Sequence, residues 1–496
     1  MNDALLFFIA IPLGAAFFIP MVSLMLKWVP DLLANAVMVV LATMAFLTIG
    51  QTGIYHLGGW GTLGIDLRLD GLTSLMLMTI NTIGLAMAIF SVQYMNQYTS
   101  KLRYYSIFLC LVAGLNGIVL TGDLFNLYIF MEIVAISSYA LVAFGCAHDE
   151  LEAAFKYAVL GTVASAFILI GIALLYAMLG TLNMAAMSVK LAAGGLNMPI
   201  TFALGLFLCG FGLKAALVPF HAWLPDAHPS APAPVSAMLS GVVIKTAGIY
   251  VLCRLVFNMF TVQLVPDLLP ILRLLGVASM IVGGILSIGQ WDMKRLLAYS
   301  SISQIGYIVV GLGLGTTLGL TGALFHLVNH SVFKSLLFLN AGAVEYATGS
   351  RDLRHLGGLR RIMPLTANTS LVGSMAISGI PPFNGFWSKL IIVLACIESG
   401  HFWLALAAIM MSLVTLVVVL KIQKHAFCEE PKPVAAHATE VPILMRTAML
   451  LLAALCVALA LLVLTGVRTP CLIAPAVDAL STWAGPAAGA GQWMGI

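Results

Sequence analysis

The sequence has very few charged residues. Asp, Glu, Lys and Arg together make up 8% of its 496 residues, whereas soluble globular domains carry roughly 25%. So few charges cannot cover the surface that a chain of this length would expose to water, which excludes soluble enzymes, nucleic-acid-binding proteins and disordered scaffolds. Because 61% of the residues are hydrophobic and the mean hydropathy is +1.06, the sequence predicts an integral membrane protein.

Cysteine patterns that bind metals are also lacking. The eight cysteines are widely spaced and no two form a CxxC pair, which excludes the usual zinc and iron–sulfur motifs. They are expected to pack as small buried apolar side chains. Neither a nucleotide-binding motif nor a set of redox ligands occurs. The sequence therefore predicts no metal, no cofactor and no nucleic-acid partner.

Long apolar stretches account for most of the chain. A spanning helix needs about 20 mostly apolar residues, and fourteen stretches qualify. Their expected bounds are 5–26, 32–51, 71–95, 104–121, 123–145, 153–178, 197–224, 233–256, 266–290, 295–315, 318–345, 364–396, 401–427 and 443–467. Alternating glycine and aromatic or β-branched residues over 52–69 predict a small hairpin outside the bilayer. The tail after 468 is rich in Ala, Gly and Pro and is too short for a long lateral helix.

Lys and Arg are distributed unevenly between the two sides of the membrane. Loops that leave odd-numbered helices hold fourteen of the 23 basic residues, and the opposite loops hold four, among them Arg254. Cytoplasmic loops are enriched in Lys and Arg. Both termini are therefore expected to lie outside the cytoplasm.

The remaining five basic residues fall inside predicted spans. They are Lys214, Lys245, Arg273, Lys334 and Lys389. A charge at the centre of a span costs roughly 2.5–3.5 kcal/mol, so it needs a partner, a water-filled cavity or a function. Arg273 lies near the start of its helix, where its long stem can reach the interface. Lys245 and Lys334 are too deep for that.

A single carboxylate, Glu132, is predicted at a similar depth in the fifth span. Removal from water disfavours the charged form of both lysine and glutamate, which suits a chain of titrating sites. The alternative is a set of static ion pairs that hold helices together. Because one acid cannot neutralise four lysines, we favour the titrating chain.

The seventh and twelfth spans contain proline-rich breaks. The seventh reads FGLKAALVPFHAWLPDAHPSAPAPVSA from residue 211, and the twelfth reads SGIPPFNGFWSKL from 378. Matching breaks in two halves indicate inverted repeats with a polar site at the break, and the alternative is that the prolines only kink the helices. We predict two inverted five-helix repeats, helices 4–8 and 9–13. The expected units are residues 1–103, 104–256, 266–427 and 443–496.

The eleventh span carries His326, His330 and Lys334 at a spacing of four. Steps of four residues drift by about 40° around a helix, so the three side chains form a polar stripe on one face. Histidine titrates near neutral pH and relays protons. Static hydrogen-bonded polar residues are one alternative. Haem ligation is another, although bis-histidine haem sites usually draw their two ligands from different helices.

With these residues, the sequence resembles the proton-translocating antiporter-like family. The family includes the MrpD-type chains of Mrp sodium/proton antiporters and the antiporter-like subunits of complex I and of membrane-bound hydrogenases. The resemblance covers roughly residues 100–400 and implies fourteen helices. The matching segments are GDLFNLYIFMEI (122–133), the stretch 211–237, WDMKRLLAYSSISQIGY (291–307), LFHLVNHSVFKSLLFLNAG (324–342) and SGIPPFNGFWSKL.

The resemblance implies roles for seven residues. In the family, a helix 5 glutamate pairs with a helix 7 lysine, a helix 8 lysine lies at the middle of the axis, and a helix 12 lysine or glutamate ends the path. The matching residues are Glu132, Lys214, Lys245 and Lys389, with His326, His330 and Lys334 as the helix 11 connection. The implied mechanism is proton transfer along a hydrated mid-membrane axis, in which Glu132 holds Lys214 charged.

Two branches of the family fit the motifs about equally, the Mrp antiporter branch and the hydrogenase branch, with complex I subunits third. Each implies a multi-pass protein of the prokaryotic inner (plasma) membrane with other integral membrane subunits as partners. The transported ion is the proton, and sodium antiport stays open. With no redox site of its own in the sequence, a partner or an ion gradient must drive uphill transport. The competing class is a redox subunit that binds quinone at the broken helices.

Overall fold

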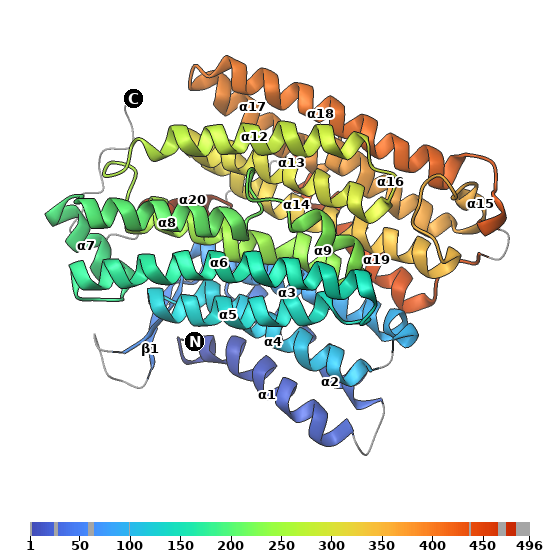
Figure 1. Ribbon diagram of the computed structural model, residues 1–496, viewed down its shortest axis with the longest axis horizontal. Coiled ribbons are helices and arrows are strands. Elements are labelled where there is room, and N and C mark those ends of the chain that lie inside the picture. Colours follow the sequence, from blue (N-terminus) through green and yellow to red (C-terminus); the bar gives the residue numbers. More distant parts are fainter. Residues whose placement is uncertain are drawn as a thin grey trace.

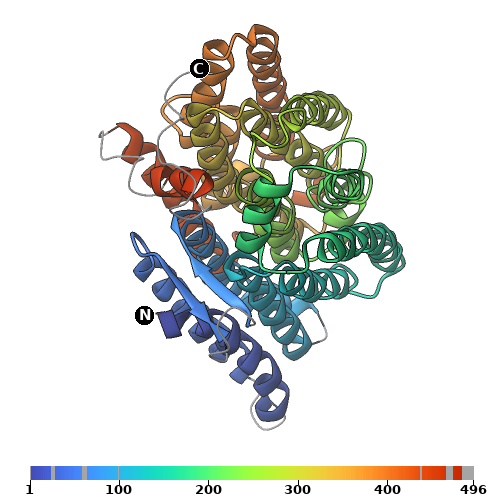
Figure 2. The same cartoon turned by 90° about the vertical axis from the view of Figure 1, so that its left-hand side faces the viewer.

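Helices form most of the computed structural model, which describes residues 2–23, 28–57, 64–98, 100–435, 438–464 and 473–482. They run along the long axis of the molecule (Figure 1), and the end-on view shows them packed into one bundle (Figure 2). Within these ranges, twelve helices are long and apolar enough to cross a membrane. The predicted all-α, multi-pass class is confirmed, while the inverted repeats stay a prediction.

The described part of residues 1–230 holds nine α-helices. They are α1 (Phe7–Ser23), α2 (Val29–Leu47), α3 (Gly71–Tyr94), α4 (Lys101–Leu120), α5 (Leu124–Val142), α6 (His148–Leu179), α7 (Met184–Gly194), α8 (Met198–Lys214) and α9 (Leu224–Ser230). The eighth span comprises α10 (Ala233–Met238), η5 (Leu239–Val243), η6 (Lys245–Tyr250), α11 (Val251–Cys253) and η7 (Arg254–Met259).

The second half of the chain also consists mainly of helices. These are α12 (Leu268–Ile288), α13 (Met293–Leu314), α14 (Thr317–Thr348), α15 (Leu359–Ile362), α16 (Pro364–Ser378), α17 (Asn384–Glu398), α18 (Phe402–Ile422), α19 (Ile443–Leu464) and α20 (Ile473–Thr482). Short helical turns are η1 (Asn2–Leu6), η4 (Met95–Gln97), η8 (Gln423–Cys428) and η9 (Pro433–Ala435).

The helix breaks lie where the sequence predicts them. Twelve of the fourteen predicted spans correspond to the twelve continuous membrane-length helices. The other two, 197–224 and 364–396, are the spans expected to be broken, and they are split into α8 with α9 and α16 with α17. The eighth span is less regular than expected, because η5, η6 and η7 are π-helical. Such wide turns are frequent at functional sites.

Capping side chains set the starts of several central helices. Asp123 accepts a hydrogen bond from the backbone N–H of Asn126 at 2.7 Å and so begins α5. Thr316 accepts one from Gly319 at 3.1 Å and begins α14. Each bond satisfies a backbone donor that has no partner inside the helix. These caps fix the register of Glu132 on α5 and of the helix 11 stripe on α14.

Short elements lie at the two ends of the bundle. Strands β1 (Gly53–His56) and β2 (Asp66–Leu69) pair antiparallel, which confirms the predicted hairpin except for residues 58–63, outside the described part. This hairpin and α7 lie at the left-hand end of the bundle, and α15 lies at the right-hand end (Figure 1). The tail contains a short helix, α20, that was not expected. Its other residues from 483 onward lie outside the description.

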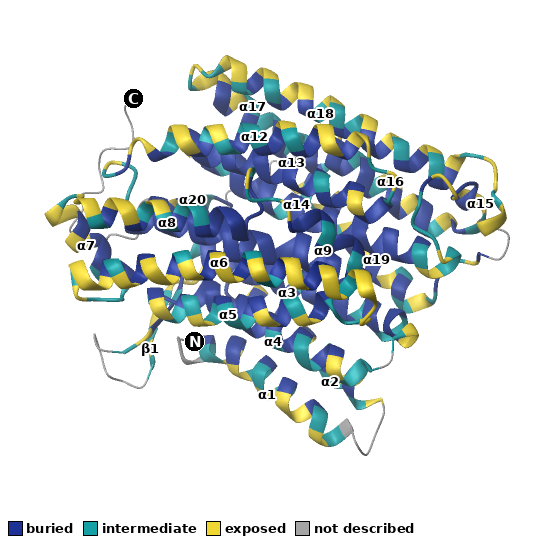
Figure 3. Cartoon of the chain, in the orientation of Figure 1, coloured by how far each residue is buried: buried dark blue, intermediate teal, exposed yellow. Residues whose placement is uncertain are grey.

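Burial is concentrated in the middle of the bundle. Helices α13 and α14 are dark along most of their length in Figure 3, whereas α6, α12 and α18 expose apolar side chains on their outer faces. Figures 1 and 2 place α1 at one edge and α17 and α18 at the opposite edge. The central helices are therefore surrounded by other helices, and the outer faces suit contact with lipid or with partner subunits.

Two arginines show how charges are placed near the helix ends. The expectation that Arg254 belongs to a loop is wrong, because it lies in η7 and is 2% exposed. Its guanidinium donates to Asp70 at 2.7 Å and to Thr73 at 2.9 Å. Arg273 on α12 donates to the carbonyl of Gly313 at 3.1 Å, near the end of α13. A cation is favourable there because the helix C-terminus is partly negative.

The Arg254–Asp70 contact is an ion pair between a buried arginine and a partly buried aspartate, and it joins the start of α3 to the end of the eighth span. Burial alone would raise the pKa of Asp70, but the adjacent guanidinium outweighs this effect and holds that pKa below its usual value. The pair therefore stabilises the fold at neutral pH. Its contribution should be lost as the pH falls through the lowered pKa.

We predict that Asp70→Asn destabilises the protein by about 3 kcal/mol, because it removes a carboxylate that lies 2.7 Å from the buried Arg254 guanidinium. Asparagine keeps the cap of α3, so the loss reports on charge alone. The measurement is the Tm of the purified protein in detergent. The control is Asp123→Asn, which changes the α5 cap at a residue with no salt bridge in the described structure. Equal Tm values for the two variants would contradict the prediction.

Candidate functional site

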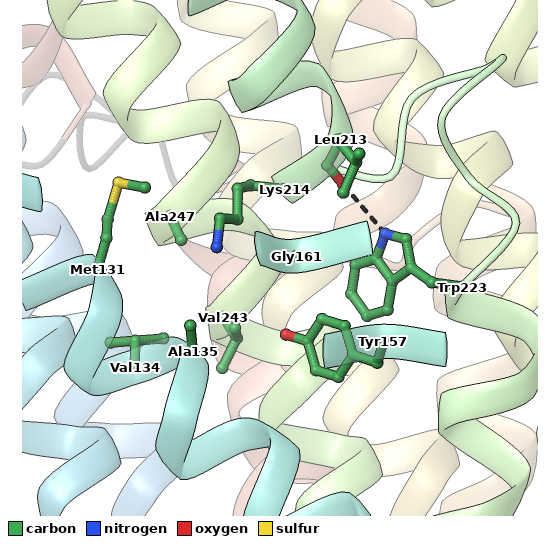
Figure 4. A pocket seen from close by; sticks show the side chains of 10 residues that line it. All are labelled: Met131, Val134, Ala135, Tyr157, Gly161, Leu213, Lys214, Trp223, Val243 and Ala247. Atoms are coloured by element: carbon green, nitrogen blue, oxygen red, sulfur yellow. Dashed lines mark hydrogen bonds between the residues drawn. The ribbon is translucent and has the colours of Figure 1, made fainter. Parts of the chain in front are cut away.

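The first break holds Lys214 at the end of α8. The chain turns after Lys214 and resumes as α9 at Leu224. The turn is held by Trp223, whose ring nitrogen donates to the carbonyl of Leu213 at 3.0 Å (Figure 4). The Trp223 ring also stacks on Tyr157 of α6, with ring centroids 4.1 Å apart. The break is thus a packed structure that fixes the lysine.

Glu132 and Lys214 are joined through a third side chain. Ser165 of α6 donates a hydrogen bond to Oε1 of Glu132, and Nζ of Lys214 donates to Oγ of Ser165 at 3.1 Å. The direct pairing that the family resemblance implies is not formed between these two residues. Ser165 was not predicted, because a lone serine in an apolar helix carries no sequence signal.

A small cavity lies beside Lys214 (Figure 4). Most of its lining is apolar, and the Lys214 side chain extends into the space between Met131 and Tyr157. Val243 and Ala247 of the eighth span also line it. These two residues precede and follow Lys245 by two positions. The cavity therefore lies between Lys214 and the helix that carries the next lysine.

Lys245 and Lys334 are fully buried, each with 0% exposure, and neutral oxygens hold both. Lys245 donates to the carbonyl of Ser240, five residues earlier in the π-helical segment. Lys334 of α14 donates to the carbonyl of Leu297 at 2.7 Å and to the hydroxyl of Ser300 on α13. A cation held only by neutral oxygens is stabilised less than one in a buried ion pair.

Lys389 lies just beyond the second break, on α17. Its ammonium donates to the carbonyl of Ile377 at 2.8 Å and to the hydroxyl of Ser412 at 3.2 Å. It also lies over the ring of Tyr307, 4.9 Å from the centroid. Ile377 belongs to the last turn of α16, whose final carbonyls have no partner inside the helix. The break therefore supplies the oxygens that hold this lysine.

The two histidines of α14 have different surroundings. His326 lies between Ser388, 2.9 Å from Nδ1, and Gln304, whose Oε1 is 3.1 Å from Nε2. The Gln304 amide nitrogen donates to Thr415 at 3.3 Å, so its oxygen faces the imidazole and accepts a hydrogen bond from Nε2. Neither ring nitrogen of His330 has a hydrogen-bond partner in the protein. The two rings are nearly parallel, with centroids 6.1 Å apart, so they share one face of the helix.

The structure thus places the predicted residues at separate sites. No hydrogen bond joins any two of these seven described residues directly. Ser165 connects the first pair, and the Tyr307 ring contacts both Lys389 and His326, with its centroid 5.6 Å from the His326 ring. The helices that carry these residues follow one another across the bundle from α5 to α17 (Figure 1).

A further buried histidine was missed. His228 lies on α9, inside the proline-rich stretch of the first break, and is 0% exposed. It stacks on Phe338 of α14, and neither of its ring nitrogens has a protein partner. Its position beside a predicted break was the available signal. Among the described residues, no group of three or more His, Cys, Asp or Glu side chains is placed to hold a metal ion.

Two family models match the chain. The model described as "NADH:quinone oxidoreductase/Mrp antiporter, TM" matches residues 121–415. The model described as "NADH-Ubiquinone oxidoreductase (complex I), chain 5 N-terminus" matches residues 59–105. Together they cover both breaks and all seven predicted residues.

Named relatives agree with these matches. The N subunit of the NADH-quinone oxidoreductase of Desulforudis audaxviator is 38% identical over 79% of this chain and 79% of its own length. The D subunit of the Na(+)/H(+) antiporter of Alkalihalophilus pseudofirmus is 35% identical over 77% of this chain and 78% of its own.

Solved structures show the same fold. A chain of the Mrp complex from Dietzia sp. superposes with a TM-score of 0.88 at 28% identity, covering 97% of both chains. A chain of an archaeal membrane-bound sulfane sulfur reductase superposes with a TM-score of 0.89 at 30% identity, covering 97% of this chain and 98% of that one.

Proposed function

The chain belongs to the family of membrane subunits that NADH:quinone oxidoreductases share with Mrp antiporters, and from this premise we propose that it moves protons across the membrane. The observation that carries the proposal is the set of four buried lysines held by neutral oxygens. A lysine in a buried ion pair is held charged by its partner. A lysine held by carbonyl and hydroxyl oxygens can give up its proton without leaving an unpaired carboxylate in the protein interior.

The proposed route crosses the bundle through the middle of the membrane. A proton passes from Lys214 to Lys245, then along the α14 stripe, and reaches Lys389. The cavity between Lys214 and the eighth span supports the first transfer. The unpartnered ring nitrogens of His330 support the middle of the route, since buried polar atoms without protein partners are commonly served by water.

The chain is proposed to work within a larger membrane assembly. Moving one proton against 100 mV requires about 2.3 kcal/mol, and we propose that partner subunits or an ion gradient supply this energy. The relatives and structural neighbours are named as parts of multisubunit complexes, and the chain matches them over most of their length. The exposed apolar faces of the outer helices suit such neighbours.

The orientation follows from the Lys and Arg bias. We propose that the α15 end faces the cytoplasm of a prokaryotic cell and that the end with β1, β2 and α7 faces outward. Arg351, Arg354, Arg360 and Arg361 all lie in or near α15. The positive-inside rule supports this placement.

The first prediction from this proposal concerns Glu132 and Lys214. If they tune a proton site, Glu132→Gln, Lys214→Met and the double variant should all assemble yet lose most of their flux, because neutral side chains cannot alternate between charge states. A static pair would behave differently, since removing both partners is much milder than removing one. The measurement is proton flux per assembled complex in proteoliposomes. Full flux in the double variant would contradict the proposal.

The second prediction concerns Lys389, the end of the proposed route. Lys389→Ala should reduce flux to near background, and Lys389→Glu should retain part of it because glutamate also carries a proton. The control is Lys421→Ala. Lys421 has a similar setting, with carbonyls of Ile288 and Gln290 as acceptors and the Trp291 ring 3.8 Å away, but it lies near the end of the bundle. Equal flux in Lys389→Ala and Lys421→Ala would remove Lys389 from the route.

The third prediction concerns the orientation of the chain. Cysteine at the exposed position His355, near α15, should react with a membrane-impermeant maleimide only after cells are opened. Cysteine at exposed Ala193 on α7 should react in intact cells. The background lacks the exposed native Cys146 and Cys428. Labelling of position 355 in intact cells would reverse the proposed orientation.

A further inference from the structure

We propose that the Ser165 hydroxyl is the proton relay between Glu132 and Lys214. The two titrating groups then exchange a proton through this hydroxyl instead of by direct contact. The inference rests on the proposed function, and it assigns a part to a residue that has no charge and no motif. Ser165 lies in the middle of α6 and is 4% exposed.

The hydrogen-bond directions around Ser165 are determined by its neighbours. An ammonium group only donates and an ionised carboxylate only accepts, whereas a hydroxyl does both. The hydroxyl therefore donates to Glu132 and accepts from Lys214, in agreement with the two contacts. This arrangement is a continuous donor–acceptor chain from the amine to the carboxylate. It is the geometry that a single-step proton relay requires.

Several other serines in the helices of this protein bond within their own helix. A helical serine commonly donates to the backbone carbonyl four residues earlier. Ser91, Ser331 and Ser399 do so, with donor–acceptor distances of 2.7, 2.8 and 2.7 Å. Ser165 instead donates across to α5. The Ser165 hydroxyl therefore bonds to the side chains of Glu132 and Lys214.

Glycines bring the three helices close enough for a short side chain to connect them. A Cβ placed at Gly210 of α8 would lie 3.0 Å from the carbonyl oxygen of Ala164, the residue before Ser165. A Cβ at Gly161, one turn earlier on α6, would lie 1.8 Å from the hydroxyl oxygen of Tyr139 on α5. A larger residue at Gly210 would press against the backbone of α6, and one at Gly161 would displace the Tyr139 side chain. The close approach keeps the Ser165 hydroxyl within reach of both partners.

The proposed step is balanced without any further reactant. As an N–H bond of the Lys214 ammonium breaks, its proton bonds to the Ser165 oxygen. At the same time the O–H bond of Ser165 breaks, and that proton bonds to Oε1 of Glu132. The products are a neutral amine, an unchanged serine and a carboxylic acid. In the reverse step, the Glu132 carboxyl proton returns through the Ser165 hydroxyl to the neutral Lys214 amine, and both groups regain their charges.

The test compares two substitutions of the same shape. Ser165→Val and Ser165→Thr are both β-branched and nearly equal in volume, and they differ only in the hydroxyl. Threonine should retain most of the wild-type proton flux per assembled complex in proteoliposomes. Valine should lower the flux by about a hundredfold, the lower end of what a positioned proton-transfer group contributes. Flux in the valine variant equal to that in the threonine variant would overturn the relay.

Two controls separate the relay from other effects. Thr162→Ala removes a hydroxyl from an exposed position on the same helix and should leave flux unchanged; a loss equal to that of valine would assign the effect to α6 as a whole and overturn the relay. If the valine variant does not assemble, Ser165→Cys replaces it. A thiol is similar in size but a weak hydrogen-bond donor, so flux should fall below wild type. Unchanged flux with cysteine would overturn the relay.

A spectroscopic readout distinguishes a relay from a purely structural serine. The infrared C=O band of the protonated Glu132 carboxyl, assigned by its absence in Glu132→Gln, should shift in Ser165→Val and stay near its wild-type position in Ser165→Thr. An unshifted band in the valine variant would overturn the contact on which the relay depends. The proposed function has a separate test, because wild-type proton flux in Glu132→Gln would contradict it. Loss of flux in Glu132→Gln together with full flux in Ser165→Val would contradict the relay alone.

Discussion

Holding a lysine charge inside a membrane without a carboxylate is the constraint on which this architecture depends. Lipid offers no hydrogen bonds, so every buried ammonium must be held by groups of the protein. Here the oxygens come from irregular backbone and from serine. The second break exposes the Ile377 carbonyl to Lys389, and the π-helical turn exposes the Ser240 carbonyl to Lys245. At these two lysines, a feature that weakens a helix also holds the cation.

Several charged residues near the ends of the bundle form ion pairs. Lys294 is 2% exposed and pairs with Glu345 at 2.7 Å, and Arg351 pairs with Asp292 at 2.5 Å. Arg254 has its own carboxylate, Asp70. Full ion pairs hold these groups in one charge state and join neighbouring elements. These ion-paired residues contrast with the four lysines in the middle of the bundle, which neutral oxygens hold.

The sequence predicted what local signals encode. Apolar length marked the fourteen spans, proline clusters marked both breaks, and charge in apolar surroundings marked Lys245 and Lys334. It did not predict the partners of these residues, because those depend on how helices far apart in sequence pack. Nothing in the local sequence distinguishes Ser165, because its contacts depend on the packing of α5 and α8 against α6. Arg254 was counted with the loops because it is close to the end of its predicted span, and only the packing shows that it is buried.

At both breaks a lysine lies near the partly negative C-terminus of a half-helix. One lysine precedes its break and the other follows it. Lys214 is the last residue of α8, so it lies at the C-terminal end of the first half-helix. Lys389 follows its break but reaches back to the C-terminal carbonyls of α16. Each lysine is thus placed at the partly negative end of a half-helix, which stabilises a cation by about 0.3–1 kcal/mol at exposed sites and more when partly buried. That is weaker than a buried ion pair, and a weak hold is what a group needs if it is to release its proton and take it back.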